Sequence, residues 1–324
     1  MNQLIRNVVR SPLLRYAAGI AVVLLLVFVV NVGSVLQSLA QVSMQDVLLI
    51  LLLSFLLVFV SVLKWSLFLR ELGNETSVIR LMRLYLLGYF VNLLVPSYVG
   101  GDIARTVAAG KGGDRAKAFS ATFLERYTGL VAMVVMALVG LLFSPAVTPA
   151  IRVAVLLVGF GTLVATIAIF LGWSSRIARR IGAPERITAV TERVENGMKI
   201  GLRKPSVLAK AAALSLIFHL LTIVNTGAVG FAVGWIDIPW VDLLVVVPLI
   251  LLIGAIPLSP QGLGIQEGAF LFFLVAVGAT DAQAISIGIV LRAKSYLLAL
   301  LGGALWFLEK GSTQTKEQQD GVSS

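Results

Sequence analysis

The stretch VLLILLLSFLLVFVSVLKWSLFL, residues 47–69, decides the fold. It carries one charged residue, Lys64, and its length matches the roughly 20 helical residues that cross about 30 Å of hydrocarbon. Such a segment must close its own backbone hydrogen bonds in the bilayer, so a helix is expected. Asp46 is placed as its N-cap, and Lys64, Trp65 and Arg70 near its end suit a membrane interface.

The whole chain has the composition of this stretch. Of its 324 residues, 58% are hydrophobic and 13% are charged, and the mean hydropathy is +0.97. A soluble domain is nearer half apolar and a quarter charged. The sequence therefore predicts an all-α polytopic integral membrane protein, with about 7–9 membrane helices if two broken or re-entrant segments are included. Further helices are expected over residues 13–36, 118–143, 151–173, 211–233 and 284–307.

Composition also limits the chemistry. The chain has no cysteine and one histidine, which excludes thiolate sites and nearly excludes histidine metal clusters, so we expect no cofactor and no metal. The net charge of +10 lies between apolar runs, which argues for the positive-inside rule and against nucleic acid as a partner. Residues 1–310 are expected to form one membrane domain, and the polar run 311–324 a disordered cytoplasmic tail.

Basic residues predict the orientation. Three linkers contain no Lys or Arg and should face outward: residues 37–45, 144–150 and 234–240. Residues 173–210 instead hold nine Lys and Arg residues against three Glu, so this stretch should rest on anionic lipid at the cytoplasmic face. We therefore expect a multi-pass protein of the cell membrane with a cytoplasmic N-terminus.

The first interruption is PSYVGGD, residues 96–102, which ends the short apolar run 81–95. Basic residues lie both before this run, at Arg80 and Arg83, and after the interruption, in residues 103–117. The chain between them should therefore enter and leave the membrane on the same face, as a re-entrant hairpin. Non-helical backbone at that depth requires protein around it or a wet cavity.

The second interruption is PLSPQGLGIQE, residues 257–267, after the apolar segment 241–260. Both interruptions follow an apolar run with proline, serine, glycines and then an acid. Paired interruptions in corresponding halves are typical of inverted-repeat transporters. The alternative is that proline and glycine occur in membrane helices without any repeat.

Ionisable residues inside apolar segments predict a site, because each is costly in hydrocarbon. Asp102 and Arg105 can pair if Gly101 begins a helix; the alternative is a solvated hairpin end. The glycines leave backbone N–H groups at a helix N-terminus, where a lipid phosphate can bind. Glu125 and Arg126 lie about eight residues beyond the basic loop, or roughly 12 Å into the membrane, which predicts pairing inside the bundle.

The last third of the chain contributes a second group. Arg292 and Lys294 indicate a polar face of the last helix turned inward, and Glu267, in the first turn after Gly264, is the natural partner of Arg292. His219 lies in the middle of an apolar helix. It is interpreted as a buried hydrogen-bonding residue, with a proton relay as the alternative.

Four motifs in this order resemble a known family: PSYVGGDIAR (96–105), FLERYTGL (123–130), PLSPQGLGIQE (257–267) and LRAKSY (291–296). The chain resembles the lysylphosphatidylglycerol synthase transmembrane-region family, flippase-like domains also found at the front of multiple peptide resistance factors, over about residues 13–310. The resemblance implies movement of phospholipids, aminoacylated phosphatidylglycerol or polyprenyl-linked lipids between leaflets. The soluble aminoacyl-transfer domain of the bifunctional factors is absent, so the chain is not expected to synthesise lysyl-lipid itself.

By that resemblance the functional residues lie in the two hairpins and the helices that follow them. The expected lipid-phosphate site comprises Pro96, Ser97, Gly100, Gly101, Asp102, Arg105, Glu125, Arg126, Ser259, Gly262, Gly264, Glu267, Arg292 and Lys294. The leading hypothesis is a lipid flippase that binds an anionic phospholipid or lipid-linked phosphate and is not an enzyme. The alternatives are a membrane-embedded enzyme with Asp102, Glu125 or Glu267 as acid or base, and a non-catalytic partner of a lipid synthase or glycosyltransferase.

Overall fold

The fold was analysed in a computed structural model of the chain. The structure describes residues 12–95, 100–110, 115–144, 147–185, 187–189, 191–192, 195, 204–256 and 259–322. These residues form helices joined by short loops, with no strand among them, which confirms the predicted all-α class. The helices are α2 (Pro12–Val30), α3 (Val32–Ala40), α4 (Met44–Glu71), α5 (Val78–Leu94), α6 (Gly100–Ala109), α7 (Arg115–Phe143), α8 (Pro149–Phe170), α9 (Trp173–Arg180), α11 (Pro205–Ala232), α12 (Trp240–Gly254), the short 3-10 helix η1 (Pro260–Gly262), α13 (Ile265–Val275) and α14 (Asp281–Val322).

Five helices of the described part are long and apolar enough to cross a membrane, namely α4, α7, α8, α11 and the segment Asp281–Glu309 of α14. The bent pair α2 and α3 can add a sixth span. Four further helices of the described part, on either side of the two interruptions, are shorter: α5 with 17 residues, α6 with 10, α12 with 15 and α13 with 11. At about 1.5 Å per residue, α6 and α13 each cover only about half of a bilayer's hydrocarbon core.

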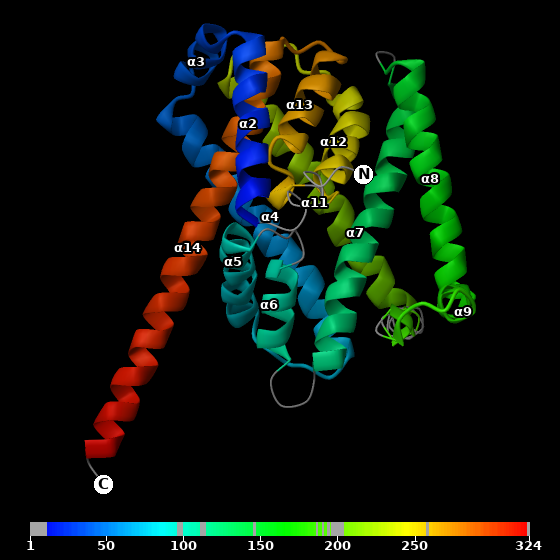
Figure 1. Ribbon diagram of the computed structural model, residues 1–324, viewed down its shortest axis with the longest axis vertical. Helices are drawn as coiled ribbons and strands as arrows, with labels where there is room; N and C mark the ends of the chain where they lie inside the picture. Colours follow the sequence, from blue (N-terminus) through cyan, green and yellow to red (C-terminus); the bar gives the residue numbers. More distant parts are fainter. Residues whose placement is uncertain are drawn as a thin grey trace.

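These short helices form two hairpins that enter the bundle from opposite faces (Figure 1). α5 rises from the lower face, on which α9 lies, and α6 returns to it, whereas α12 descends from the upper face and α13 returns there. The hairpin predicted at residues 96–101 is therefore re-entrant, and the second interruption forms its inverted counterpart. The tip residues 96–99 and 257–258 lie outside the described residues.

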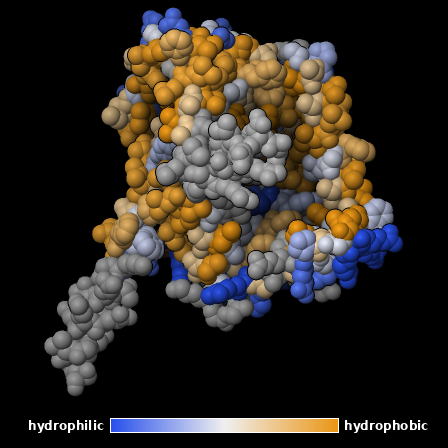
Figure 2. Space-filling view, in the orientation of Figure 1, coloured by the Kyte–Doolittle hydropathy of each residue, from blue (hydrophilic) through white to orange (hydrophobic). Residues whose placement is uncertain are grey.

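The two faces differ as the basic residues predict. α9, with Arg176, Arg179 and Arg180, lies at the lower end of the bundle, and the connection between α7 and α8 lies at the upper end (Figure 1). Figure 2 shows hydrophobic residues over most of the visible face and hydrophilic residues at its upper and lower edges, including a strongly hydrophilic group near α9. This pattern suits a bundle held in a membrane with its basic edge at one surface.

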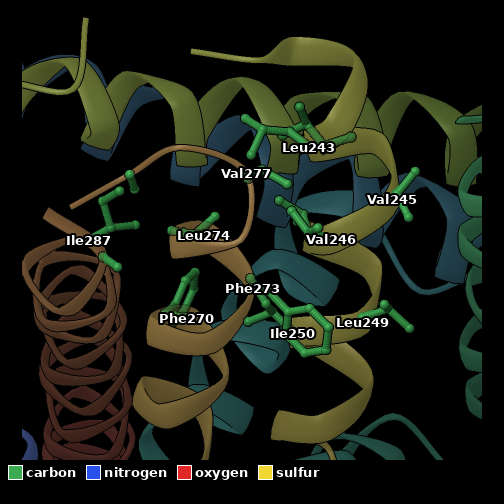
Figure 3. Packing of buried hydrophobic residues seen from close by; sticks show 14 of the residues in the cluster. Leu243, Val245, Val246, Leu249, Ile250, Phe270, Phe273, Leu274, Val277 and Ile287 are labelled. Atoms are coloured by element: carbon green, nitrogen blue, oxygen red, sulfur yellow. The ribbon is translucent and has the colours of Figure 1, made fainter. Parts of the chain in front are cut away.

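The second hairpin is buried in apolar side chains (Figure 3). Leu243, Val246 and Ile250 of α12 face Phe270 and Leu274 of α13, and all five are buried. The first hairpin packs through small residues instead. Gly101 of α6 lies so close to the backbone of Gly88 on α5 that a Cβ at position 101 would overlap it. Small residues allow such close backbone approach between membrane helices.

The prediction of one continuous helix over residues 13–36 is wrong. The chain breaks at Asn31, where φ is 82°, and the helices on either side meet at 93°. The Asn31 side chain accepts a hydrogen bond from the backbone N–H of Gly33 and so caps α3. The sequence did not predict this bend, because a single asparagine in an apolar run can lie within a helix or act as the N-cap of a new one.

Two further expectations concern helix ends. Ser43, rather than Asp46, is the N-cap of α4, and Asp46 completes the capping box by accepting from the Ser43 backbone N–H at 2.9 Å. The helix thus begins one turn earlier than predicted. At the other end of the chain, α14 continues as helix to Val322. The disordered tail beyond Lys310 stays a prediction.

Candidate functional site

The tips of the two hairpins touch at the centre of the bundle. Gln261 Nε2 of the second hairpin donates a hydrogen bond to the backbone oxygen of Asn92, at the end of α5, at 2.5 Å. Asn92 Oδ1 in turn accepts from the backbone N–H of Gly101, at the start of α6, at 2.6 Å. Gln261 itself has a left-handed backbone, with φ at 50°, which turns the chain at the tip. One asparagine therefore joins both hairpins.

The first charged cluster surrounds the start of α6. Arg105 binds Asp102 at 2.9 Å and Glu125, from α7, at 2.6 Å. Arg126 adds a bidentate contact with Asp102, at 2.7 and 2.9 Å. Arg105 is 1% exposed and Glu125 is 2% exposed. Glu125 therefore pairs inside the bundle, as predicted, whereas the Arg126 side chain is 54% exposed. The alternative of a solvated hairpin end is wrong for the buried Arg105.

Aromatic residues hold Arg105 in place. Its guanidinium lies 4.5 Å from the ring of Trp65 and 4.4 Å from the ring of Tyr85. The Tyr85 hydroxyl donates to Glu125 at 3.4 Å. One nitrogen, Arg105 Nη1, is buried and has no hydrogen-bond partner among the described residues. A buried cationic N–H without an acceptor is costly, so this nitrogen marks a place for an anionic group.

The interface expected at Lys64 and Trp65 is wrong. Both side chains are buried, at 3% and 0% exposure, because this side of α4 faces α11 and the first hairpin rather than lipid. Lys64 Nζ donates to Ser215 Oγ of α11 at 3.2 Å. Its ammonium group also lies 5.9 Å from the ring of Phe218. Lys64 forms no ion pair within the described part of the chain.

The second charged cluster surrounds the start of α13. Arg292 of α14 pairs with Glu267, as predicted, and Glu267 also accepts from the backbone N–H of Gly264 at 2.7 Å. Arg292 further donates to the backbone oxygen of Gln261 at 3.3 Å. Its remaining contact is Gln266 Oε1, at 3.5 Å. The ion pair is buried, with Glu267 at 2% and Arg292 at 11% exposure.

The two clusters correspond to each other. Asp102 is the third residue of α6, and Glu267 is the third residue of α13. Each acid binds an arginine on the following long helix, 24 residues later for Arg126 and 25 residues later for Arg292. The hairpins enter from opposite faces (Figure 1). This correspondence favours the inverted-repeat interpretation over chance breaks in two helices.

A cavity of about 450 Å³ lies between the two clusters. Helices from both halves of the chain line this cavity. The start of α6 and the second hairpin tip at Gln261 also contribute to its lining. Helix N-termini direct free N–H groups and the positive end of the helix dipole toward such a space. The charged side chains that line it are Lys64, Asp102, Arg105, Glu125, Arg126, Arg292 and Lys294.

The other predicted site residues have different positions. Gly100 begins α6, and Gly262 and Gly264 have φ values of 68° and 82°, so these two glycines shape the second tip. Ser259 Oγ is buried without a hydrogen-bond partner among the described residues. Pro96 and Ser97 lie outside the described residues. No group of three or more metal-ligating side chains occurs in the part of the chain that the structure describes.

Sequence reasoning missed several residues of the site, namely Lys64, Trp65, Tyr85, Asn92, Gln261 and Gln266. Lys64 could have been found from the sequence, because a charged residue within a membrane-spanning apolar segment is costly and indicates a buried site. His219 was placed correctly: its Nε2 lies 2.9 Å from the backbone oxygen of Gly129, and its side chain is buried. This contact fits the buried hydrogen-bonding interpretation.

Residues 16–303 match the family described as the lysylphosphatidylglycerol synthase TM region. The chain belongs to this family. The lysylphosphatidylglycerol synthase TM-region match includes both hairpins and both charged clusters, so the site lies in the shared part of the chain. A protein of Pyrococcus horikoshii named UPF0104 membrane protein is 22% identical over 319 residues, covering 89% of this chain and 94% of that protein. A UPF0104 membrane protein of Methanothermobacter thermautotrophicus is 23% identical over 341 residues, covering 96% of each.

Proposed function

We propose that this protein moves a lipid with a phosphate-containing headgroup between the two leaflets of the membrane. The observation that carries the proposal is the central cavity, where two hairpins from opposite faces meet and place Arg105, Arg126 and Arg292 around one space. Arginine binds phosphate oxygens bidentately. The headgroup would pass through this cavity while its acyl chains stay in the surrounding hydrocarbon.

The position of the cavity supports transport. Binding sites of inverted-repeat transporters lie near the membrane midplane, between broken helices whose N-termini point at anionic substrate groups. Here α6 and α13 both begin at the hairpin tips. The hydrogen bond between Gln261 and Asn92 links the two hairpins. A bond of this kind can open without breaking either hairpin.

The carboxylates are arranged for holding arginines rather than for acid or base chemistry. Asp102 binds both Arg105 and Arg126, Glu125 binds Arg105, and Glu267 binds Arg292. A general acid or base needs a carboxyl group within reach of the substrate proton and with a pKa near the operating pH. Three carboxylates engaged by guanidinium groups favour a transporter over a membrane-embedded enzyme.

The orientation is part of the proposal: the face that carries α9 is cytoplasmic, the N-terminus lies on that side, and the membrane is the plasma membrane. Because the chain contains no cysteine, a single cysteine can report its side. Thr148→Cys should react with an impermeant maleimide on intact cells, and Arg180→Cys only after permeabilisation. The reverse pattern would contradict this orientation.

Transport itself is tested in liposomes. Purified protein is reconstituted with phosphatidylglycerol that carries a fluorescent label, and dithionite is added to bleach the outer leaflet. We expect nearly complete bleaching with protein and about half without it, and the lipid should be recovered chemically unchanged. Recovery of a modified lipid would favour the enzyme, and no exchange with any lipid would favour the non-catalytic partner.

A further inference from the structure

The charges around the cavity do not balance. The three arginines are matched by three carboxylates: Asp102 and Glu125 in the first cluster and Glu267 in the second. Two lysines also line the cavity, Lys64 from α4 and Lys294 from α14. Neither lysine forms an ion pair with any residue that the structure describes. The cavity therefore carries an excess of two positive charges when both lysines are protonated.

The two lysines belong to different halves of the molecule. Lys64 lies beside the first cluster, where it is 3% exposed and its only hydrogen bond within the described chain is to Ser215 Oγ. Lys294 lies two residues beyond Arg292, beside the second cluster, with no described hydrogen bond. Buried charges without a partner are unfavourable, and an ion that supplies the missing charge is favoured at such a position.

A third feature indicates the same ligand chemistry. Arg105 lines the same cavity as both lysines, and its Nη1 is buried and has no acceptor among the described residues. The starts of α6 and α13 add the positive ends of two helix dipoles. These features make a site with free donors and two spare positive charges. A phosphate monoester supplies what is missing, since it has a charge close to −2 and three acceptor oxygens.

We infer that the site selects a phosphate group with two negative charges, a lipid phosphomonoester, over phosphodiester headgroups with one or no net charge. This inference rests on the proposed lipid transport and adds the charge class of the headgroup. A zwitterionic or cationic headgroup leaves both lysines uncompensated. A singly charged phosphodiester compensates one of them. Phosphatidic acid is the simplest membrane lipid with the required group.

The test compares labelled phosphatidic acid, phosphatidylglycerol and phosphatidylethanolamine in proteoliposomes at pH 7. Phosphatidic acid should exchange at least about tenfold faster than phosphatidylglycerol, since one retained ion pair in a partly buried site corresponds to a factor of about ten. At pH 5 the monoester holds its second proton, whose pKa is about 6, and the preference should disappear.

Variants identify the lysines as the cause. Lys294→Gln, at a half-buried position without a described partner, should reduce the ratio of phosphatidic acid to phosphatidylglycerol exchange by about threefold or more, and Lys64→Gln/Lys294→Gln should bring it close to one. Lys210→Gln is the matched control, because Lys210 is exposed on α11 and does not line the cavity. A ratio that stays at the wild-type value in the double variant would overturn the inference.

The same vesicles separate this inference from the proposed function. Equal exchange of all three lipids would overturn the dianion site and leave lipid transport intact. Uptake of radiolabelled inorganic phosphate without any lipid exchange would support the dianion site, with free phosphate as the ligand, and would overturn lipid transport. Preferential exchange of phosphatidic acid without uptake of inorganic phosphate would support both the dianion site and lipid transport.

Discussion

The Gln261 side chain donates a hydrogen bond to the Asn92 backbone oxygen at 2.5 Å and so links the tips of two hairpins that enter from opposite faces. The same glutamine offers its own backbone oxygen to Arg292. Gln261 therefore contacts both Arg292 of the second charged cluster and Asn92 of the first hairpin. A headgroup that draws Arg292 toward itself would weaken this contact and let the tips separate.

Gln261→Leu should loosen the link between the two tips. Loss of one hydrogen bond corresponds to about 1 kcal/mol, so exchange of a poorly selected lipid such as phosphatidylcholine should rise by about fivefold. The measurement is dithionite bleaching of labelled phosphatidylcholine. Gln283→Leu is the control, because Gln283 makes a comparable bond to the Gly234 backbone oxygen at 2.9 Å, away from the cavity. An equal rise in both variants would contradict a specific role for the Gln261–Asn92 hydrogen bond in limiting exchange.

Arg105→Gln should destabilise the fold strongly. The substitution leaves Glu125 buried without its main partner and removes the cation between Trp65 and Tyr85. Removing one member of a buried ion pair costs about 3–5 kcal/mol. Thermal unfolding of the purified protein in detergent gives the change. Arg179→Gln breaks only the exposed pair with Glu192, at 3.8 Å, and should cost less than about 1 kcal/mol.

Glu267 and Arg292 should show strong thermodynamic coupling. Glu267→Gln and Arg292→Gln should each destabilise the protein, because each leaves a buried partner uncompensated. The double variant should recover part of this loss, with a coupling free energy of about 1–3 kcal/mol in a double-mutant cycle. Lipid exchange should not recover in the double variant, since it still lacks the arginine. Additive stability effects would contradict the buried ion pair.

Gly101→Ala should displace the first hairpin. A Cβ at this position would overlap the Gly88 backbone and lie 2.8 Å from the Asn92 side chain. Overpacking of this kind costs about 1–3 kcal/mol and should shift α6 away from α5, with loss of lipid exchange. Gly161→Ala on α8 is the control, since a Cβ there meets no atom within 4 Å. Normal exchange by Gly101→Ala would show that this close packing is not required.

The sequence was sufficient to predict the two chain interruptions and the Asp102–Arg105 and Glu267–Arg292 ion pairs, but not the Arg105–Glu125 and Arg126–Asp102 pairs. Breakers between short apolar runs, with basic residues on both sides, are enough to place a re-entrant segment, and the cost of charge in hydrocarbon is enough to predict that Glu267 and Arg292 pair. The pattern of apolar and charged residues in a single sequence does not show which face of a helix meets which neighbour. Lys64 and Trp65 therefore read as an interface, although α11 and the first hairpin bury them.

The contact between the tips was also beyond prediction. Asn92 and Gln261 are neutral polar residues beside proline and glycine, and such residues are common in any turn. Only the meeting of two segments 169 residues apart gives them a role. The bend at Asn31 is similar, since its cause is a local cap inside an otherwise uninterrupted apolar run.

The most direct test of lipid transport is leaflet exchange of a labelled phosphate-headed lipid by the wild-type protein, Arg126→Ala and Arg292→Ala, with Arg179→Ala as the surface control. Arg126 and Arg292 both line the cavity, one in each charged cluster. We predict that wild type and Arg179→Ala exchange the lipid, and that Arg126→Ala and Arg292→Ala are slower by about tenfold or more. Equal rates in all four folded proteins, or no exchange above protein-free liposomes, would contradict transport through this cavity.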